Sequence, residues 1–166
     1  MNNIILIGMP GCGKTTIGRE LAKILGRSFF DADQVLEEVS GYKIPELFAQ
    51  GEEVFRAVES ETIAYLATKV GSVIATGGGV VKKEANIKAL HLSGVIIFLN
   101  RSPEQIVCDV DTTSRPLLAA GKEKIYNIHE ERIALYYKYA DYVVSCDRAV
   151  PDILAEILVI LKEVGI

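Results

Sequence analysis

The sequence has no tryptophan, two histidines, three cysteines and no long apolar run. Cys12, Cys108 and Cys146 are scattered along the chain without the spacing of metal ligands. We therefore expect reduced thiols in a cytoplasmic protein, with neither disulfide bonds nor zinc. No apolar run approaches the ~18 residues that span a bilayer. Because the apolar residues 4–7 lack a preceding basic region, we also expect no signal peptide and no membrane partner.

Basic residues are not in excess either. The chain has 18 lysines and arginines against 22 aspartates and glutamates, which gives a formal net charge of −4. Nucleic acids attract proteins largely through positive charge, so a nucleic-acid partner is not expected. Any anionic ligand must instead be held by a few local cations, and individual arginines therefore matter more than the total.

The length and composition fit one globular domain. The chain has 166 residues, of which 49% are hydrophobic and 24% charged. No linker or repeat divides it, so we expect a single domain over residues 1–166 that is a monomer. Five β-branched or aromatic runs alternate with segments of helical period, which predicts an α/β fold with a five-stranded parallel sheet. The predicted strands are residues 3–7, 28–30, 72–75, 95–99 and 142–145.

Apolar residues at helical spacing predict helices between these strands. Two longer helices are expected around residues 55–66 and 129–140. Residues 111–124 are polar and contain a proline and a glycine, so this segment is predicted to be a mobile cover over a site. The predicted apolar stripes are Ile17, Leu21, Ile24 and Leu25 in the first helix and residues 150–164 in the last.

A phosphate-binding loop is predicted directly after the first strand. Residues 8–15 read GMPGCGKT and satisfy G-x-x-x-x-G-K-[ST] at the start of a predicted helix. Backbone N–H groups of such a loop surround phosphates, Lys14 reaches the β- and γ-phosphates and Thr15 ligates Mg²⁺. The motif leaves open whether the phosphate goes to water, to a switch mechanism or to an acceptor. The predicted nucleotide-binding residues of the loop are Gly11, Cys12, Gly13, Lys14, Thr15 and Thr16.

Two carboxylates follow the second predicted strand. Asp31 and Asp33 lie at a carboxyl end of the sheet, where ligands bind in parallel folds. Their spacing of two places both on one side of an extended segment. Asp31 can then hold the hydration shell of Mg²⁺, while Asp33 accepts a proton from an attacking hydroxyl. The alternative is that Asp33 only caps a helix over residues 34–40.

Two further features point to an acceptor site. Residues 77–79 are three glycines after the third predicted strand, where backbone N–H groups can approach a ligand closely. The alternative for them is a flexible turn. Arg56 and Glu59 lie one helical turn apart, so that the carboxylate can orient the guanidinium. The alternative for this pair is a solvated surface contact.

In their order along the chain, these motifs resemble the shikimate kinase family. The pattern includes GMPGCGKTT, FDAD, GExxFRxxE, GGG and RPLL, and it ends with Arg132 five residues before Tyr137. The resemblance implies a three-layer P-loop kinase fold with a five-stranded parallel sheet and a mobile lid. It also implies ATP-dependent phosphorylation of the 3-hydroxyl of shikimate to shikimate 3-phosphate, in the route to chorismate and aromatic amino acids.

The resemblance further assigns roles to single residues. Asp33 both holds shikimate and takes the proton of its 3-hydroxyl, and Lys14 acts with it in catalysis. Arg115, in a lid over residues 111–124, closes on the ATP phosphates. The implied shikimate-binding residues are Asp33, Arg56, Gly77, Gly78, Gly79 and Arg132.

The nucleotide side departs from the family pattern at one position. Most family members carry a basic residue seven positions before the lid arginine, and here that position is Cys108. In the family, the adenine lies between that basic side chain and a proline that Pro151 matches. Arg148, three residues before Pro151, is the candidate to supply the missing cation.

Two other functions compete with this interpretation. One is a P-loop kinase for another small metabolite, such as gluconate or a nucleoside monophosphate, which would not need the Arg56, Glu59 and Arg132 combination. The other is a catalytically silent nucleotide-binding regulator. Such a protein has no physical need for all four of Lys14, Thr15, Asp33 and Arg115.

Overall fold

The computed structural model describes residues 2–109 and 121–166. Five strands form one sheet in the order β2-β3-β1-β4-β5, and every neighbouring pair is parallel. All residues of the central strand β1 are buried, because helices cover both faces of the sheet. The five predicted strands are thereby confirmed to within one residue at each end. Their bounds are β1 Asn3–Ile7, β2 Phe29–Asp31, β3 Val73–Ala75, β4 Gly94–Asn100 and β5 Tyr142–Ser145.

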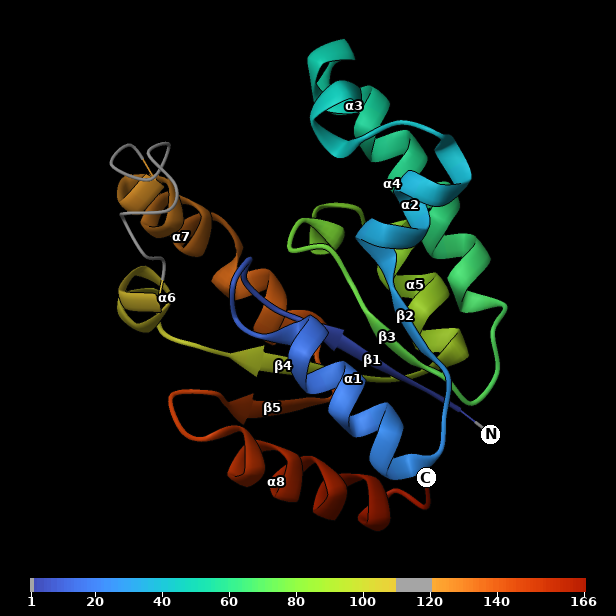
Figure 1. Ribbon diagram of the computed structural model, residues 1–166, viewed down its shortest axis with the longest axis vertical. Coiled ribbons are helices and arrows are strands. Elements are labelled where there is room, and N and C mark those ends of the chain that lie inside the picture. Colours follow the sequence, from blue (N-terminus) through green and yellow to red (C-terminus); the bar gives the residue numbers. More distant parts are fainter. Residues whose placement is uncertain (1, 110–120) are drawn as a thin grey trace.

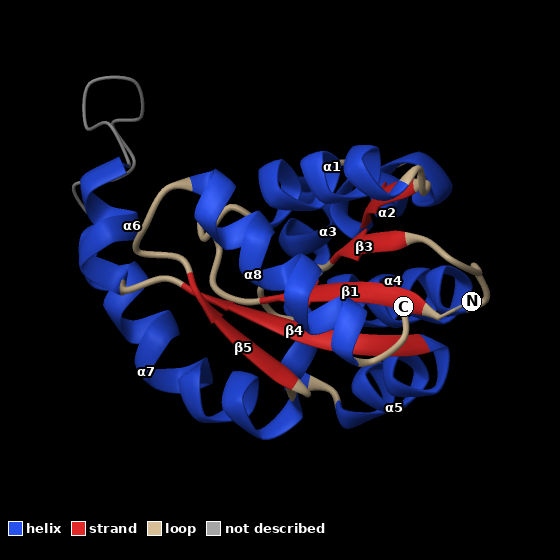
Figure 2. Ribbon diagram, turned by 90° about the horizontal axis from the view of Figure 1, so that it is seen from below, coloured by secondary structure: helices blue, strands red, loops and turns tan. Residues whose placement is uncertain are grey.

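Helices form the two outer layers. Figure 2 shows α1 (Lys14–Leu25) and α8 (Val150–Glu163) on one face of the sheet, with α5 (Glu84–Ser93) and α7 (Gly121–Tyr139) on the other. The predicted three-layer α/β architecture is therefore confirmed. No helix in residues 2–109 and 121–166 is long and apolar enough to cross a membrane. The remaining helices are α2 Ala32–Ser40, α3 Ile44–Gln50, α4 Glu52–Ala67, the 3₁₀ turn η1 Val80–Lys82 and α6 Pro103–Asp109.

Helices α2, α3 and α4 form a separate group beside the sheet (Figure 1). Leu36, Leu47 and Phe55 are its buried centre, distinct from the main core. This group faces the carboxyl ends of β2 and β3 and so provides a wall for anything bound at that edge.

The structure differs from the sequence-based expectations in three places. The stripe on α1 is wrong at Ile24, which is 52% exposed, because α8 and the sheet cover only part of the helix surface. The predicted stripe of the last helix is also wrong at Val164, which follows the end of α8 and is exposed. Residues 121–124, expected in a mobile cover, form the first turn of α7. The rest of that segment, including Arg115, lies outside the described residues.

Candidate active site

Residues 8–13 form the loop between β1 and α1, as the motif predicts. Gly8, Gly11 and Gly13 have φ values of 148°, 81° and 97°, a region that side chains disfavour. At Gly8 a Cβ would also lie 2.6 Å from the carbonyl oxygen of Leu99. The glycines therefore let the loop turn tightly against β4 and direct the N-terminus of α1 at the space beyond the sheet.

Lys14 lies across this loop. Its Nζ donates to the carbonyl oxygens of Gly8 at 2.9 Å and Met9 at 2.8 Å, and the residue is buried. Cys12 is buried too, with Sγ 3.7 Å from Lys14 Nζ. The Cys12 side chain is thus turned inward, so that only its backbone can face a phosphate.

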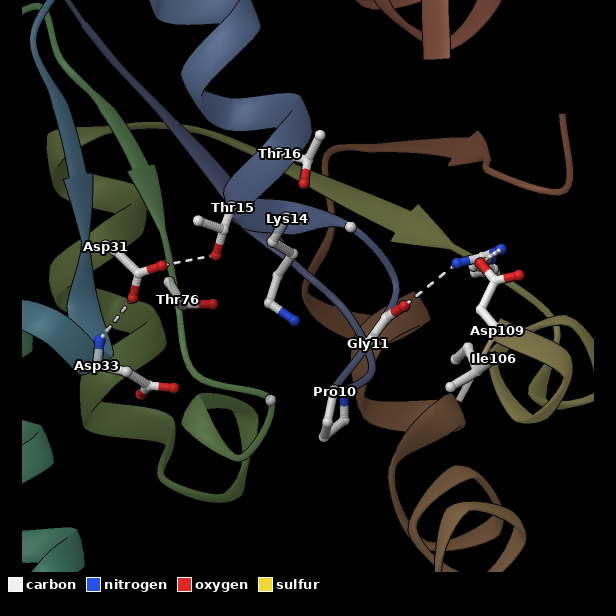
Figure 3. Close-up of a pocket in the computed structure, with 13 residues that line it drawn as sticks. Pro10, Gly11, Lys14, Thr15, Thr16, Asp31, Asp33, Thr76, Ile106 and Asp109 are labelled. Atoms are coloured by element: carbon white, nitrogen blue, oxygen red, sulfur yellow. Dashed lines mark hydrogen bonds and ion pairs between the residues drawn. The ribbon is translucent and has the colours of Figure 1, made fainter. Parts of the chain in front are cut away.

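Two cavities meet at the carboxyl edge of the sheet. The first, about 570 Å³ in volume, is lined by the P-loop and by Asp31 (Figure 3). The second, about 480 Å³, is lined by Arg56, the glycine triplet and Arg132. Pro10, Asp33 and Gly78 line both cavities. The structure therefore brings the predicted nucleotide and acceptor residues into adjoining spaces, with Asp33 at the junction.

Asp31 and Asp33 have different structural roles. Asp31 Oδ1 caps α2 by accepting from the backbone N–H groups of Asp33 at 3.1 Å and Gln34 at 3.4 Å. Its Oδ2 accepts from Thr15 Oγ1 at 2.6 Å. The expectation of an extended segment is wrong, because the chain enters α2 directly after Asp31. The cap alternative for Asp33 is wrong as well, since Asp31 occupies that position and leaves the Asp33 carboxylate facing the cavities.

The electrostatic environment makes Asp33 a stronger base than an ordinary aspartate. Its carboxylate is open to the cavities, but protein atoms surround it on the other sides. This partial loss of solvent raises the pKa of Asp33, and the negative charge of Asp31 raises it further, while Lys14 acts in the opposite direction.

Arg56 is held inside the second cavity by carboxylates of its own helix. Its Nη1 donates to Glu59 Oε2 at 2.7 Å, and both residues are buried. Its Nε also lies 3.4 Å from Glu52 Oε1. The surface-pair alternative is therefore wrong, and the guanidinium is oriented as the spacing predicts.

The glycine triplet is tightly packed. A Cβ on Gly79 would lie 2.3 Å from Arg56 Nη1, and one on Gly77 would lie 2.9 Å from Asp33 Oδ1. A Cβ on Gly78 would lie 2.7 Å from Pro10. These close approaches rule out a merely flexible turn, because each glycine leaves room for a neighbouring site residue.

Helix α7 contributes Arg132, which is buried. One turn later, Tyr136 Oη donates to the carbonyl oxygen of Gly78 at 2.5 Å, and burial raises the pKa of this phenol. The bond ties α7 to the glycine triplet. It therefore helps to place Arg132 opposite Arg56 in the second cavity.

Residues 10–162 match the family model for shikimate kinase. The chain belongs to the shikimate kinase family. It is 46% identical over 156 residues to the shikimate kinase of Clostridium botulinum strain Eklund 17B, with 94% of each chain covered. The structure of shikimate kinase from Acinetobacter baumannii in complex with shikimate is similar at a TM-score of 0.89 and 33% identity, over 98% of this chain and 94% of that one. Shikimate kinase from Aquifex aeolicus is similar at a TM-score of 0.85 and 32% identity, over 99% and 98%.

The departure from the shikimate kinase pattern lies on the nucleotide side. Cys108 is exposed, and neither Arg148 nor Pro151 is among the residues that line the two cavities. Arg148 instead forms an ion pair with Glu156 on α8. Its role as a substitute cation stays a prediction without support from this geometry.

A different arginine lines the first cavity. Arg101, directly after β4, forms an ion pair with Asp109 and donates from Nη1 to the carbonyl oxygen of Gly11 at 3.4 Å. The sequence contained a signal for it, because it follows a strand at the same edge of the sheet as the P-loop. Other lining residues that the sequence did not single out are Thr76, Ile106, Ile44, Phe48, Glu52, Lys82, Lys124, Ile128 and Glu131.

Proposed function

We propose that the first cavity binds ATP, that the second binds shikimate and that Asp33 acts between them. Membership of the shikimate kinase family makes the reaction the ATP-dependent phosphorylation of shikimate. The observation that carries the arrangement is the position of Asp33 in the walls of both cavities. The 3-hydroxyl of shikimate would face this carboxylate on one side and the γ-phosphate on the other, as an in-line transfer requires.

The nucleotide half of the proposal rests on the P-loop. Its backbone N–H groups, with the side chains of Lys14 and Thr16, would hold the phosphates of ATP. Thr15 and Asp31 fit a Mg²⁺ ion, because a hydroxyl and a carboxylate lie 2.6 Å apart in the cavity wall. Mg²⁺ takes oxygen ligands and usually keeps waters and substrate phosphates, so two protein groups suffice. Bound with ATP, the ion would neutralise charge on the transferring phosphoryl group.

The acceptor half rests on Arg56 and Arg132. Two guanidinium groups from different helices can fix one carboxylate in a single orientation. Glycines 77–79 leave room for shikimate close to the backbone. Asp33 would then accept the proton of the 3-hydroxyl, and its raised pKa favours that task. Closure of Arg115 on the phosphates remains a prediction.

Turnover with defined acceptors tests this function. Release of ADP would be measured with Mg-ATP alone and with shikimate, gluconate or a nucleoside monophosphate. We expect rapid release only with shikimate, and shikimate 3-phosphate as the product identified by phosphorus NMR. Equal release without an acceptor, or faster release with gluconate, would contradict the proposal.

We also propose that the protein works as a single-domain monomer in the cytoplasm. The P-loop, Asp33, Arg56 and Arg132 of the same chain line the two cavities, which supports a monomer. Cys12, Cys108 and Cys146 are free thiols, which suits a reducing compartment. Light scattering during gel filtration, with and without ATP, tests the monomeric state.

A further inference from the structure

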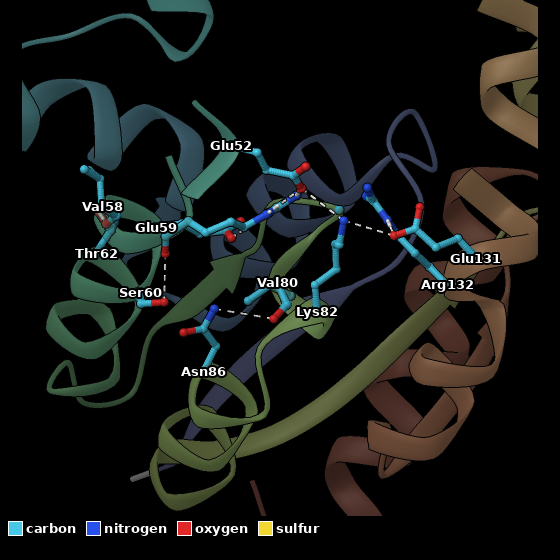
Figure 4. A network of polar contacts seen from close by, with 12 residues as sticks. Glu52, Val58, Glu59, Ser60, Thr62, Val80, Lys82, Asn86, Glu131 and Arg132 are labelled. Atoms are coloured by element: carbon cyan, nitrogen blue, oxygen red, sulfur yellow. Dashed lines mark hydrogen bonds and ion pairs between the residues drawn. The ribbon is translucent and has the colours of Figure 1, made fainter. Parts of the chain in front are cut away.

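Lys82 lies at the centre of a charged network beside the proposed shikimate cavity (Figure 4). Its Nζ is 3.0 Å from Glu52 Oε1 and 3.0 Å from Glu131 Oε1. Glu52 precedes Arg56 by one turn of α4, and Glu131 is next to Arg132 on α7. Lys82 ends the turn η1, which follows the glycine triplet. One lysine therefore connects the two helices that carry the arginines.

Each of the two arginines has a neighbouring acid that can compete with a substrate carboxylate for the guanidinium group. Glu52 Oε1 lies 3.4 Å from Arg56 Nε, and Glu131 Oε1 lies 3.9 Å from Arg132 Nε. Both oxygens are closer to Lys82. Arg132 Nε is buried and has no hydrogen-bond partner in residues 2–109 and 121–166, so it remains available to a ligand.

The charge balance of the second cavity also depends on Lys82. The described residues that line it include four basic and four acidic side chains. Without Lys82 the acids would outnumber the bases, and an anionic substrate would enter a cavity of its own sign. The charged lining residues are Arg56, Lys82, Lys124 and Arg132 against Asp33, Glu52, Glu59 and Glu131.

We propose that Lys82 is a positioning residue for the carboxylate of the acceptor. It holds Glu131 away from Arg132, whose Nε then remains available to the substrate. It also competes with Arg56 for Glu52, which accepts from Arg56 Nε only at 3.4 Å but lies 3.0 Å from Lys82 Nζ, and so weakens the hold of Glu52 on that guanidinium. The inference rests on the proposed function, because it needs an anionic acceptor in this cavity. The alternative is that Lys82 only stabilises the fold through its two ion pairs. Such a contribution would be small, because the Lys82 side chain is 30% exposed and both acids are about half exposed.

The variant Lys82→Met tests the proposal once turnover of shikimate by the unmodified enzyme has been established. We expect the Kd of shikimate, measured by calorimetry without nucleotide, and its KM to rise about fivefold, the scale of a partly exposed ion pair. The KM for ATP and kcat at saturating shikimate should stay unchanged. Lys83→Met is the matched control, because Lys83 is the next residue, is exposed and forms no ion pair within the described parts of the chain. It should leave shikimate binding unchanged.

A second substitution separates positioning from direct contact. If Lys82 acts by holding acids away, Glu131→Gln should restore much of the lost affinity in the Lys82→Met background and change it far less in the unmodified enzyme. If Glu131→Gln changed the Kd of shikimate by the same factor in both backgrounds, Lys82 would contact shikimate itself, and the proposal would be wrong. Unchanged shikimate affinity in Lys82→Met, with only a lower Tm, would overturn it too and leave a structural ion pair.

Discussion

Asp31 and Asp33 are joined by a hydrogen bond of 3.1 Å from the backbone N–H of Asp33 to Asp31 Oδ1. The carboxylate of Asp31 is thus occupied by the cap of α2 and by Thr15. That of Asp33 lines both cavities. Two acids close in sequence therefore occupy different positions, one in the cap of α2 and beside Thr15, the other in the walls of both cavities.

The first prediction concerns Asp33→Asn. Because an amide cannot accept the hydroxyl proton, we expect kcat to fall by about 10²-fold or more. The cap of α2 should survive, since it uses Asp31 and the backbone of residue 33. Steady-state kinetics, with calorimetry of ATP binding and circular dichroism as controls, checks this. Turnover similar to that of the unmodified enzyme would remove Asp33 from catalysis.

The pH profile of the unmodified enzyme gives a second prediction. Protonated Asp33 cannot act as a base, so kcat/KM for shikimate should be high above its pKa and be lost as the pH falls through it. Partial desolvation and the charge of Asp31 raise that pKa above the ordinary value of 3.8, so the acid limb should lie above pH 3.8. A profile that stays flat to pH 3.8 while circular dichroism shows folded protein would contradict the assignment.

The third prediction compares Arg56→Met with Arg132→Met. Each should raise the Kd of shikimate about 10- to 100-fold, because a charged hydrogen bond contributes about 1.5 to 3 kcal/mol. ATP affinity should barely change. Arg56→Met should also lower the Tm more, since it leaves Glu59 buried without its partner at 2.7 Å. If either variant lost as much affinity for ATP as for shikimate, that arginine would be assigned to nucleotide binding instead.

Arg101→Met is the fourth prediction. Arg101 donates a hydrogen bond to the carbonyl oxygen of Gly11 and lines the cavity proposed to bind ATP, so its loss should weaken ATP binding about threefold to tenfold without changing shikimate binding. The affinity for inorganic tripolyphosphate should fall by a similar factor if Arg101 acts through the P-loop. Arg148→Met is the control, because Arg148 pairs with Glu156 outside the cavity. A larger ATP defect in the control would restore Arg148 as the substitute cation.

The fifth prediction is that Gly79→Ala acts through Arg56. Gly79 has a φ of −96°, which alanine adopts without strain, but its Cβ would lie 2.3 Å from Arg56 Nη1. The guanidinium must therefore move, and we expect the KM for shikimate to rise about tenfold, as for a weakened charged contact. If Gly79→Ala adds nothing in the Arg56→Met background, the effect runs through the arginine. Equal effects in both backgrounds would contradict this.

The sequence by itself determined the features that depend on neighbouring residues. The P-loop could be recognised because its glycines, Lys14 and Thr15 lie within eight consecutive residues and follow a strand that is apolar except for Asn3. The parallel sheet was predictable because strands buried on both faces are apolar throughout and alternate with helices. The order of motifs was enough to identify the shikimate kinase family, and the match of residues 10–162 to the family model confirms it.

Tertiary structure alone decided which side chains meet. Spacing could pair Arg56 with Glu59 but could not show that both are buried, and an apolar stripe could not show that Ile24 is exposed. Residue types in the sequence could not reveal that Lys82 joins α4 to α7 or that Arg101 reaches Gly11. The physical reason is that burial and charge pairing depend on how helices distant in sequence pack around the sheet, whereas a local pattern specifies only the helix itself.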